Sequence, residues 1–134
     1  MTALKTPAPD AHAAEWGLFA VSIPGWRWLP GTRYFYGGFC AGTGASENYI
    51  DRLWEDDGGP YDHAISPAPD PDDAATEGVL LRLIGPCEVG YDDADPACGP
   101  WSVEIPGHFR MGVTIGRAAI AVAAANGRWP GGAS

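Results

Sequence analysis

The chain has 134 residues, a length that suits one domain with a modest hydrophobic core. Hydrophobic residues make up 46% of it, and six Trp, five Tyr and four Phe supply bulky packing groups, so the composition excludes an intrinsically disordered acidic chain. The 17 acidic and 8 basic residues give a formal net charge of −9, which argues against nucleic acid as a direct ligand because such a protein repels phosphates.

The negative charge is concentrated in the middle of the chain. Between Glu55 and Asp95 there are twelve carboxylates and a single base, Arg82, whereas the rest of the chain carries five acids and seven bases. General acidity of the kind that keeps halophilic proteins soluble is one explanation, but such acidity should spread over the whole surface. The clustering favours a binding surface for a positively charged partner.

The cysteines and the N-terminus indicate a reduced, cytoplasmic setting. Cys40, Cys87 and Cys98 are an odd number, and the N-terminus has no basic segment followed by an apolar one. The longest apolar stretch, residues 118–125, has eight residues, far fewer than the ~20 that span a bilayer. We therefore expect no membrane partner.

Residues 1–14 are rich in Ala, Pro and Asp without periodicity and predict a flexible tail before a single domain at 15–130. From Trp16 onward the chain becomes apolar and β-branched. We predict a pair of N-terminal strands at residues 18–23 and 33–39, with a turn at Pro24-Gly25 after the first strand.

A glycine-rich segment, residues 37–46, leads into a predicted helix at 47–54 with Ser46 as its N-cap. A strand, a glycine loop and a helix N-terminus form the layout that binds phosphate. The segment lacks a Gly-Lys-Ser/Thr sequence and the third glycine of the dinucleotide pattern. We therefore favour a structural role, in which the glycines form a tight turn.

Residues 55–69 predict a long, exposed acidic loop, which in a compact domain is usually functional or disordered. A helix is predicted at 71–84, with Asp70 as N-cap, Pro71 in the first turn and Gly85-Pro86 as the stop. Its inward stripe of Leu80, Leu83 and Ile84 is expected to pack on a sheet.

Alternating apolar residues predict a hairpin of strands at 87–91 and 101–105, connected by residues 92–100. A last, Ala-rich helix is predicted at 115–125 with Asn126-Gly127 as its C-cap. Strands and helices in this mixed order indicate an α+β domain, an antiparallel sheet packed by two or three helices.

One part of the chain resembles a known group of proteins. The segment from Asp70 to Leu83, with its Ala75-Thr76-x-Gly78-x-Leu80-Leu81-x-Leu83 core, precedes a Trp-bearing strand, an Ala-rich helix and a Gly127-Arg128-Trp129-Pro130 ending. In this C-terminal half the chain resembles small uncharacterised accessory proteins of phages and prophages in GC-rich bacteria. The resemblance implies a mobile-element context and no catalytic residues.

No pattern of metal ligands or catalytic residues stands out. His12, His63 and His108 lie at no ligand spacing from one another or from the cysteines. Asp92, Asp93 and Asp95 lack the spacing and the terminal Glu of an EF-hand. Paired carboxylates for glycoside hydrolysis meet in space and leave no trace in spacing. We expect no catalytic residue, cofactor or metal.

The leading hypothesis is a non-enzymatic protein that binds a basic, nucleic-acid-handling host protein through an acidic surface that imitates phosphates, as an anti-CRISPR or other anti-defence inhibitor would. The predicted partner-binding residues are Glu55, Asp56, Asp57, Tyr61, Asp62, Asp72, Asp73, Asp92, Asp93 and Asp95. One alternative is a virion or assembly protein that associates through Trp26, Trp28 and Trp129. Another is an enzyme that binds a phosphorylated small molecule at residues 42–46.

Overall fold

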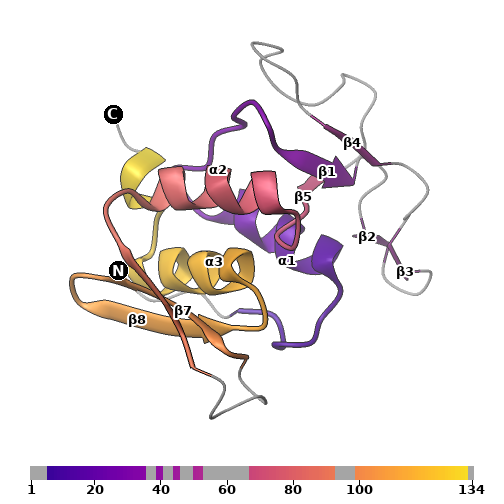
Figure 1. Cartoon of the computed structure of the whole chain (residues 1–134). Helices are drawn as coiled ribbons and strands as arrows, with labels where there is room; N and C mark the ends of the chain where they lie inside the picture. The colour runs from indigo at the N-terminus through magenta and orange to yellow at the C-terminus, as the bar shows by residue number, and fades with distance from the viewer. Residues whose placement is uncertain are drawn as a thin grey trace.

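The computed structural model describes residues 6–35, 67–92 and 99–132, and between them the backbone of short strands at 39–40, 44–45 and 50–52 (Figure 1). Its α-helices are α1 (Ala13–Ser22), α2 (Ala74–Ile84) and α3 (Ile115–Asn126), and a short 3-10 helix, η1 (Pro130–Gly132), follows. Together with small antiparallel sheets they form an α+β fold, as predicted. Among the described residues, no helix is long and apolar enough to cross a membrane.

The described strands form three small antiparallel sheets. One has the order β4-β1-β5 and one pairs β2 with β3, while the C-terminal sheet has the order β6-β7-β8. The strand bounds are β1 (Arg33–Phe35), β2 (Phe39–Cys40), β3 (Gly44–Ala45), β4 (Ile50–Arg52), β5 (Ala68–Pro69), β6 (Glu88–Tyr91), β7 (Trp101–Ile105) and β8 (His108–Gly112). The predicted hairpin at 87–91 and 101–105 is the β6–β7 pair, and β8 extends it.

Helix α3 lies at the centre of the fold. Every residue from Gly116 to Ala124 is buried, because α3 packs against β7 and β8 on one side and against α2 on the other (Figure 1). Thr114 caps its start by accepting a hydrogen bond from Arg117 N at 3.2 Å, and Gly127 ends it in the left-handed conformation. Small Ala side chains let three elements approach this helix closely.

Helix α2 begins three residues later than predicted. Asp73 is its N-cap, because its carboxylate accepts a hydrogen bond from Thr76 N at 3.0 Å, whereas Asp70 forms the preceding turn by accepting from Asp72 N. Gly85 ends the helix, as expected. The stripe that includes Leu80 and Leu83 is buried against α3, not against a sheet, since α3 separates α2 from the β6-β7-β8 sheet.

The predicted strand at 18–23 is wrong, since these residues belong largely to α1. The His12 ring nitrogen caps the helix by accepting from Ala14 N, and Trp16 and Ala20 turn into the core at helical spacing. The predicted tail at 1–14 is anchored at its end, because Trp16 Nε1 donates to the Ala8 carbonyl at 2.9 Å. The ordered domain therefore begins before residue 15.

The predicted helix at 47–54 is also wrong, because Ile50–Arg52 forms strand β4. This strand pairs with β1 in the register Phe35↔Ile50, so backbone pairing overrides the helical spacing of the apolar residues. The predicted phosphate site at residues 42–46 required a helix directly after it, and residues 50–52 form a strand instead.

Trp129 packs in the core, and Trp26 packs against it. Trp129 is fully buried, its Nε1 donates to the Ala20 carbonyl at 3.1 Å, and its ring centroid lies 5.7 Å from that of Trp26. Trp28 contacts Trp26 edge-on at 5.2 Å between centroids. The three rings predicted to mediate self-association thus contact one another within the protein, with Trp129 buried and Trp26 and Trp28 half-buried.

Candidate functional site

Most of the predicted acidic binding surface lies outside the described residues. Seven of the ten predicted residues do so: Glu55, Asp56, Asp57, Tyr61, Asp62, Asp93 and Asp95. The structure places the other three, Asp72, Asp73 and Asp92, at two separate locations. Asp72 and Asp73 precede α2, and Asp92 follows β6.

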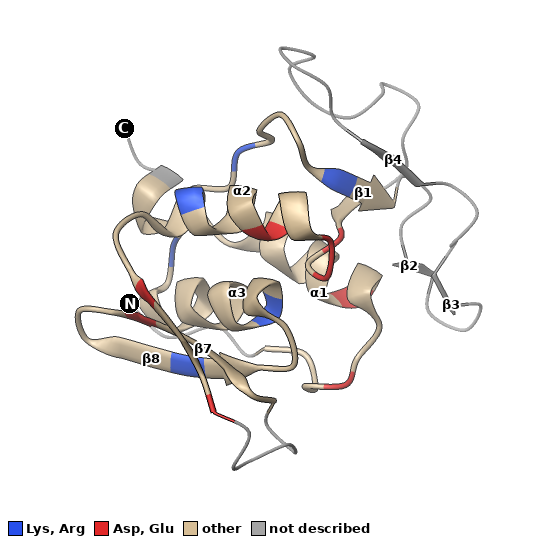
Figure 2. Cartoon of the chain, in the orientation of Figure 1, with Lys and Arg blue, Asp and Glu red and all other residues tan. Residues whose placement is uncertain are grey.

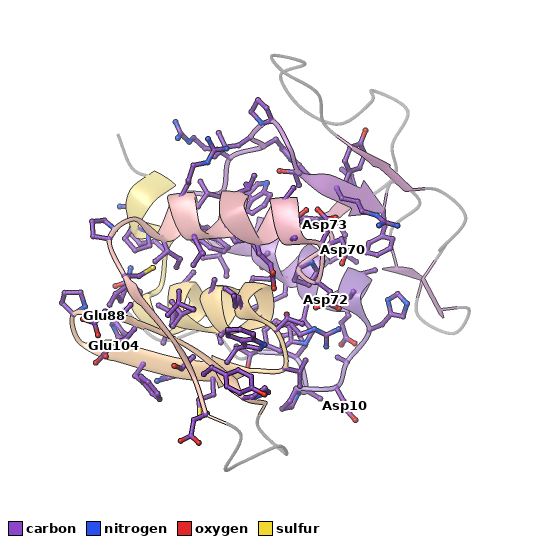
Figure 3. All side chains as sticks on the ribbon, in the orientation of Figure 1. Asp10, Asp70, Asp72, Asp73, Glu88 and Glu104 are labelled. Atoms are coloured by element: carbon purple, nitrogen blue, oxygen red, sulfur yellow. The ribbon has the colours of Figure 1, made fainter. Side chains whose placement is uncertain are left out.

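Asp72 and Asp73 make contacts within the protein. Arg117 donates from Nε to Asp72 Oδ1 at 3.0 Å and from Nη2 to Oδ2 at 2.9 Å, while Asp73 caps α2. Figure 3 shows Asp70, Asp72 and Asp73 close together at the start of α2. Burial raises the pKa of Asp70, and it also raises the pKa of Glu77 in the first turn of α2. These carboxylates lie at the junction between α2 and α3, where Asp72 pairs with Arg117 and Asp73 caps α2.

The arginines whose side chains the structure describes lie on several different elements of the fold. Arg117 is buried against Asp72, Arg33 lies 3.8 Å from Asp70, and Arg110 lies on β8 (Figure 2). Arg27 and Arg128 are exposed on segments before β1 and after α3. Of these five arginines, Arg117 and Arg33 are therefore held beside aspartates within the fold.

Exposed apolar side chains gather on the β6-β7-β8 sheet. Within the described ranges the large hydrophobic side chains that stay exposed are Val89 (42%), Tyr91 (62%) and Phe109 (50%), on β6 and β8. The carboxylates of Glu88, Asp92 and Glu104 are exposed on the same sheet or just beyond its strand ends. We call these six residues the sheet patch. It combines apolar and acidic groups on two edge strands and the strand between them.

The strand register assigns the sheet patch to two faces. Val89 and Tyr91 oppose Val103 and Trp101, so they share the face that packs on α3, but α3 packs mainly on β7 and β8. The apolar side chains of β6 are therefore exposed beyond the edge of the helix. The Tyr91 ring contacts Trp101 edge-on, with 4.9 Å between centroids, which holds it in place.

The outer face of this sheet is acidic. Glu88 lies directly opposite Glu104 on the neighbouring strand, and Glu104 lies opposite Phe109 on the other side. Figure 3 shows Glu88 and Glu104 side by side, away from the aspartates of α2. Like charges opposite each other on neighbouring strands destabilise a sheet. A cation between the two carboxylates would relieve that repulsion.

An open hollow of about 490 Å³ adjoins the two glutamates. Pro86, Cys87, Ile105 and the Pro106-Gly107 turn line the rest of it. Burial raises the pKa of the Cys87 thiol, so it stays largely protonated near neutral pH and is a weak nucleophile. The walls can thus accept an aliphatic chain that ends in a positive charge.

No group of three or more His, Cys, Asp and Glu side chains in the described part of the chain is placed to hold a metal ion. The side chains of the sheet patch can bind a partner through charge and apolar contact.

Sequence reasoning missed most of the sheet patch. The alternation of apolar residues predicts that Val89 and Tyr91 face inward, and both lie on the inner face of the sheet. The sequence does not indicate that β6 is an edge strand, which is why both side chains are exposed. Strand β8, with Phe109, was not predicted at all. The signal for it was present, because Pro106-Gly107 after an alternating run is a turn between paired strands, and Gly107 has φ +88°.

Comparison with models of protein families, with curated proteins and with solved structures finds no match to this chain.

Proposed function

We propose that this protein is a non-enzymatic binding protein that engages a basic surface of a nucleic-acid-handling host protein, as an inhibitor of the anti-CRISPR or other anti-defence type. The observation that carries the proposal is the sheet patch. Val89, Tyr91 and Phe109 are exposed on the same small sheet as the carboxylates of Glu88, Asp92 and Glu104. Val89 and Tyr91 lie along the uncovered edge of the inner face, and Phe109 lies beside Glu104 on the outer face. Exposed apolar side chains near polar ones are typical of protein interaction sites.

The charges of the patch favour a cationic partner. Coulomb attraction between an acidic surface and a basic one accelerates association and makes it sensitive to salt. Glu88 and Glu104 face each other on neighbouring strands and repel each other in the free protein, and a bound cation would convert this repulsion into attraction. Tyr91 supplies the aromatic contact area that commonly dominates binding energy at interfaces.

The partner class follows from the charge of the chain and from its resemblance to phage accessory proteins. Twelve carboxylates against one base between Glu55 and Asp95 imitate the charge of a nucleic acid. Proteins that bind nucleic acid carry basic grooves that such a surface can occupy. Neither alternative function gains support, since Trp129 is buried and residues 50–52 form a strand rather than the helix a phosphate site needed.

The test is capture of partners from a nuclease-treated host lysate, followed by affinity measurements with the purified partner over a salt series. We expect the affinity to fall steeply with salt and the double variant Glu88→Gln, Glu104→Gln to bind about tenfold more weakly. The matched control is Asp10→Asn, Glu15→Gln, which removes the same charge from exposed positions outside the sheet. An affinity that neither salt nor the glutamate variant changes would refute the proposal.

A further inference from the structure

We propose that the free edge of β6 accepts an extended strand of the basic partner, in which cationic and apolar side chains alternate. The proposal rests on the proposed function and specifies how the partner binds. Strand β6 lies at the edge of the β6-β7-β8 sheet, and no described strand pairs with its other side. Addition of a strand to an exposed sheet edge is a recurrent mode of peptide recognition.

The hydrogen bonds of the sheet show which backbone groups face the free edge. Asp92 N donates to the Pro100 carbonyl at 2.7 Å, one step beyond the Tyr91↔Trp101 pair. Opposed pairs in an antiparallel ladder alternate between hydrogen-bonded and non-hydrogen-bonded. Gly90 and Glu88 therefore bond to β7, whereas the N–H and C=O groups of Val89 and Tyr91 point away from it.

The residues with outward-pointing backbone groups also have the exposed apolar side chains. Val89 is 42% exposed and Tyr91 62% exposed, and both lie on the inner face of the sheet where α3 no longer covers it. A strand added at this edge would place apolar side chains beside Val89 and Tyr91. It would satisfy four backbone groups and bury two apolar side chains at once.

The outer face selects positive charge at the other positions of the added strand. Side chains there would lie next to Glu88, which already faces Glu104. The hollow of about 490 Å³ beside these glutamates has room for the aliphatic part of Lys or Arg along Pro86 and Pro106. Charge complementarity therefore favours basic residues at the positions of the added strand that face outward.

A second copy of the chain is a poorer occupant. Two β6 strands paired antiparallel with Gly90 opposite Gly90 would place Glu88 of each copy opposite Asp92 of the other. Two repulsive pairs would result, and like charges opposite each other destabilise a sheet. A basic strand replaces both with attraction.

The first experiment uses a fluorescent peptide of alternating Arg and Val as the probe. Its control is the same peptide with N-methyl groups on alternate residues, which keeps every charge and side chain but removes the donors that face β6. We expect the unmodified peptide to bind at least about tenfold more tightly, since each lost hydrogen bond weakens binding several-fold. Amide exchange measured by NMR should slow at Val89 and Tyr91 when the peptide binds, while Gly90 is already protected without it.

The second experiment changes the protein. Val89→Pro removes one outward-facing N–H and leaves the ladder to β7 intact, because proline is tolerated at an edge position of this kind. Val89→Thr is the matched control that keeps the N–H. We expect Val89→Pro to lose about tenfold in affinity relative to Val89→Thr, with similar urea midpoints for the two variants. If Val89→Pro does not fold, the peptide pair and the amide exchange still decide the question.

Several results would overturn strand addition. They are equal binding of the two peptides, unchanged exchange at Val89 and Tyr91 in the complex, no binding of the alternating peptide, and a dimer in which these amides are protected without peptide. Equal and salt-sensitive binding of both peptides would refute strand addition alone and leave an acidic binding surface in place. Captured partners whose affinity ignores salt and the glutamate variant would refute the proposed function itself.

Discussion

Replacement of Arg117 by methionine should be among the most destabilising single changes in this protein. The side chain is 9% exposed and makes two hydrogen bonds to the carboxylate of Asp72, and it also donates to the Pro9 carbonyl at 3.0 Å and the Ala11 carbonyl at 2.6 Å. It therefore joins α3, the turn before α2 and the segment before α1. Methionine keeps much of the length and apolar contact but none of these donors.

The expected loss can be worked out from the exposure of the groups left behind. Removing one partner of a buried ion pair costs about 3–5 kcal/mol, because the other charge stays buried without compensation. The Asp72 side chain keeps 35% of its surface exposed, so water solvates it in part and the lower end of that range applies. We expect a loss of about 3 kcal/mol in the free energy of unfolding.

Urea unfolding followed by tryptophan fluorescence measures this loss. Arg128→Met is the control, since Arg128 is exposed and such surface changes stay within about 0.5 kcal/mol. Asp72→Asn in the Arg117→Met background should recover part of the stability, because it removes the uncompensated charge. The reasoning fails if Arg117→Met and Arg128→Met unfold at the same urea concentration.

Two further predictions concern stability. Gly78→Ala should stabilise the protein by about 0.5–1 kcal/mol, because a Cβ at this helical position meets nothing within 4 Å, whereas in Gly116→Ala the Cβ would collide with the Pro71 carbonyl. Similar thermal midpoints for these two variants would contradict the packing described for α3. Burial raises the pKa of Asp70 and Glu77, so the folded state holds protons that the unfolded state releases, and their contribution to stability falls as pH rises from about 4. Asp70→Asn should therefore gain stability relative to wild type between about pH 4 and pH 7 in urea titrations, and a gap that does not change with pH would count against this.

Local signals predicted α2, the β6–β7 hairpin and α3 in the C-terminal half of the fold, though not β8. The glycines that end α2 and α3 adopt positive φ, at 83° for Gly85 and 84° for Gly127, which is a requirement that the residue type alone reveals. The β6–β7 hairpin followed from strict alternation. Helix α1 was missed because its short apolar run fits either period, and what decides it is tertiary contact. A Cβ at Gly17 would overlap the Pro69 carbonyl, so glycine allows α1 to approach β5.

The candidate site was less predictable than the fold, because it depends on what covers each strand. Val89 and Val103 look alike in sequence, yet Val103 is fully buried under α3 and Val89 is 42% exposed at the sheet edge. The roles of the acids were equally hidden. From the sequence, Asp72 is predicted to be a surface charge, because its partner Arg117 lies 45 residues later in the chain.

The position of α3 in the chain order has a consequence for synthesis of the protein. This helix fills the centre of the fold, yet it follows all the strands and both other α-helices in sequence. Until Ile115–Asn126 leaves the ribosome, the inner face of the β6-β7-β8 sheet and the apolar stripe of α2 have no surface on which to pack. Folding must therefore wait for nearly all of this sequence to emerge, and nascent chains that stop before Ile115 should expose apolar surface to chaperones and proteases.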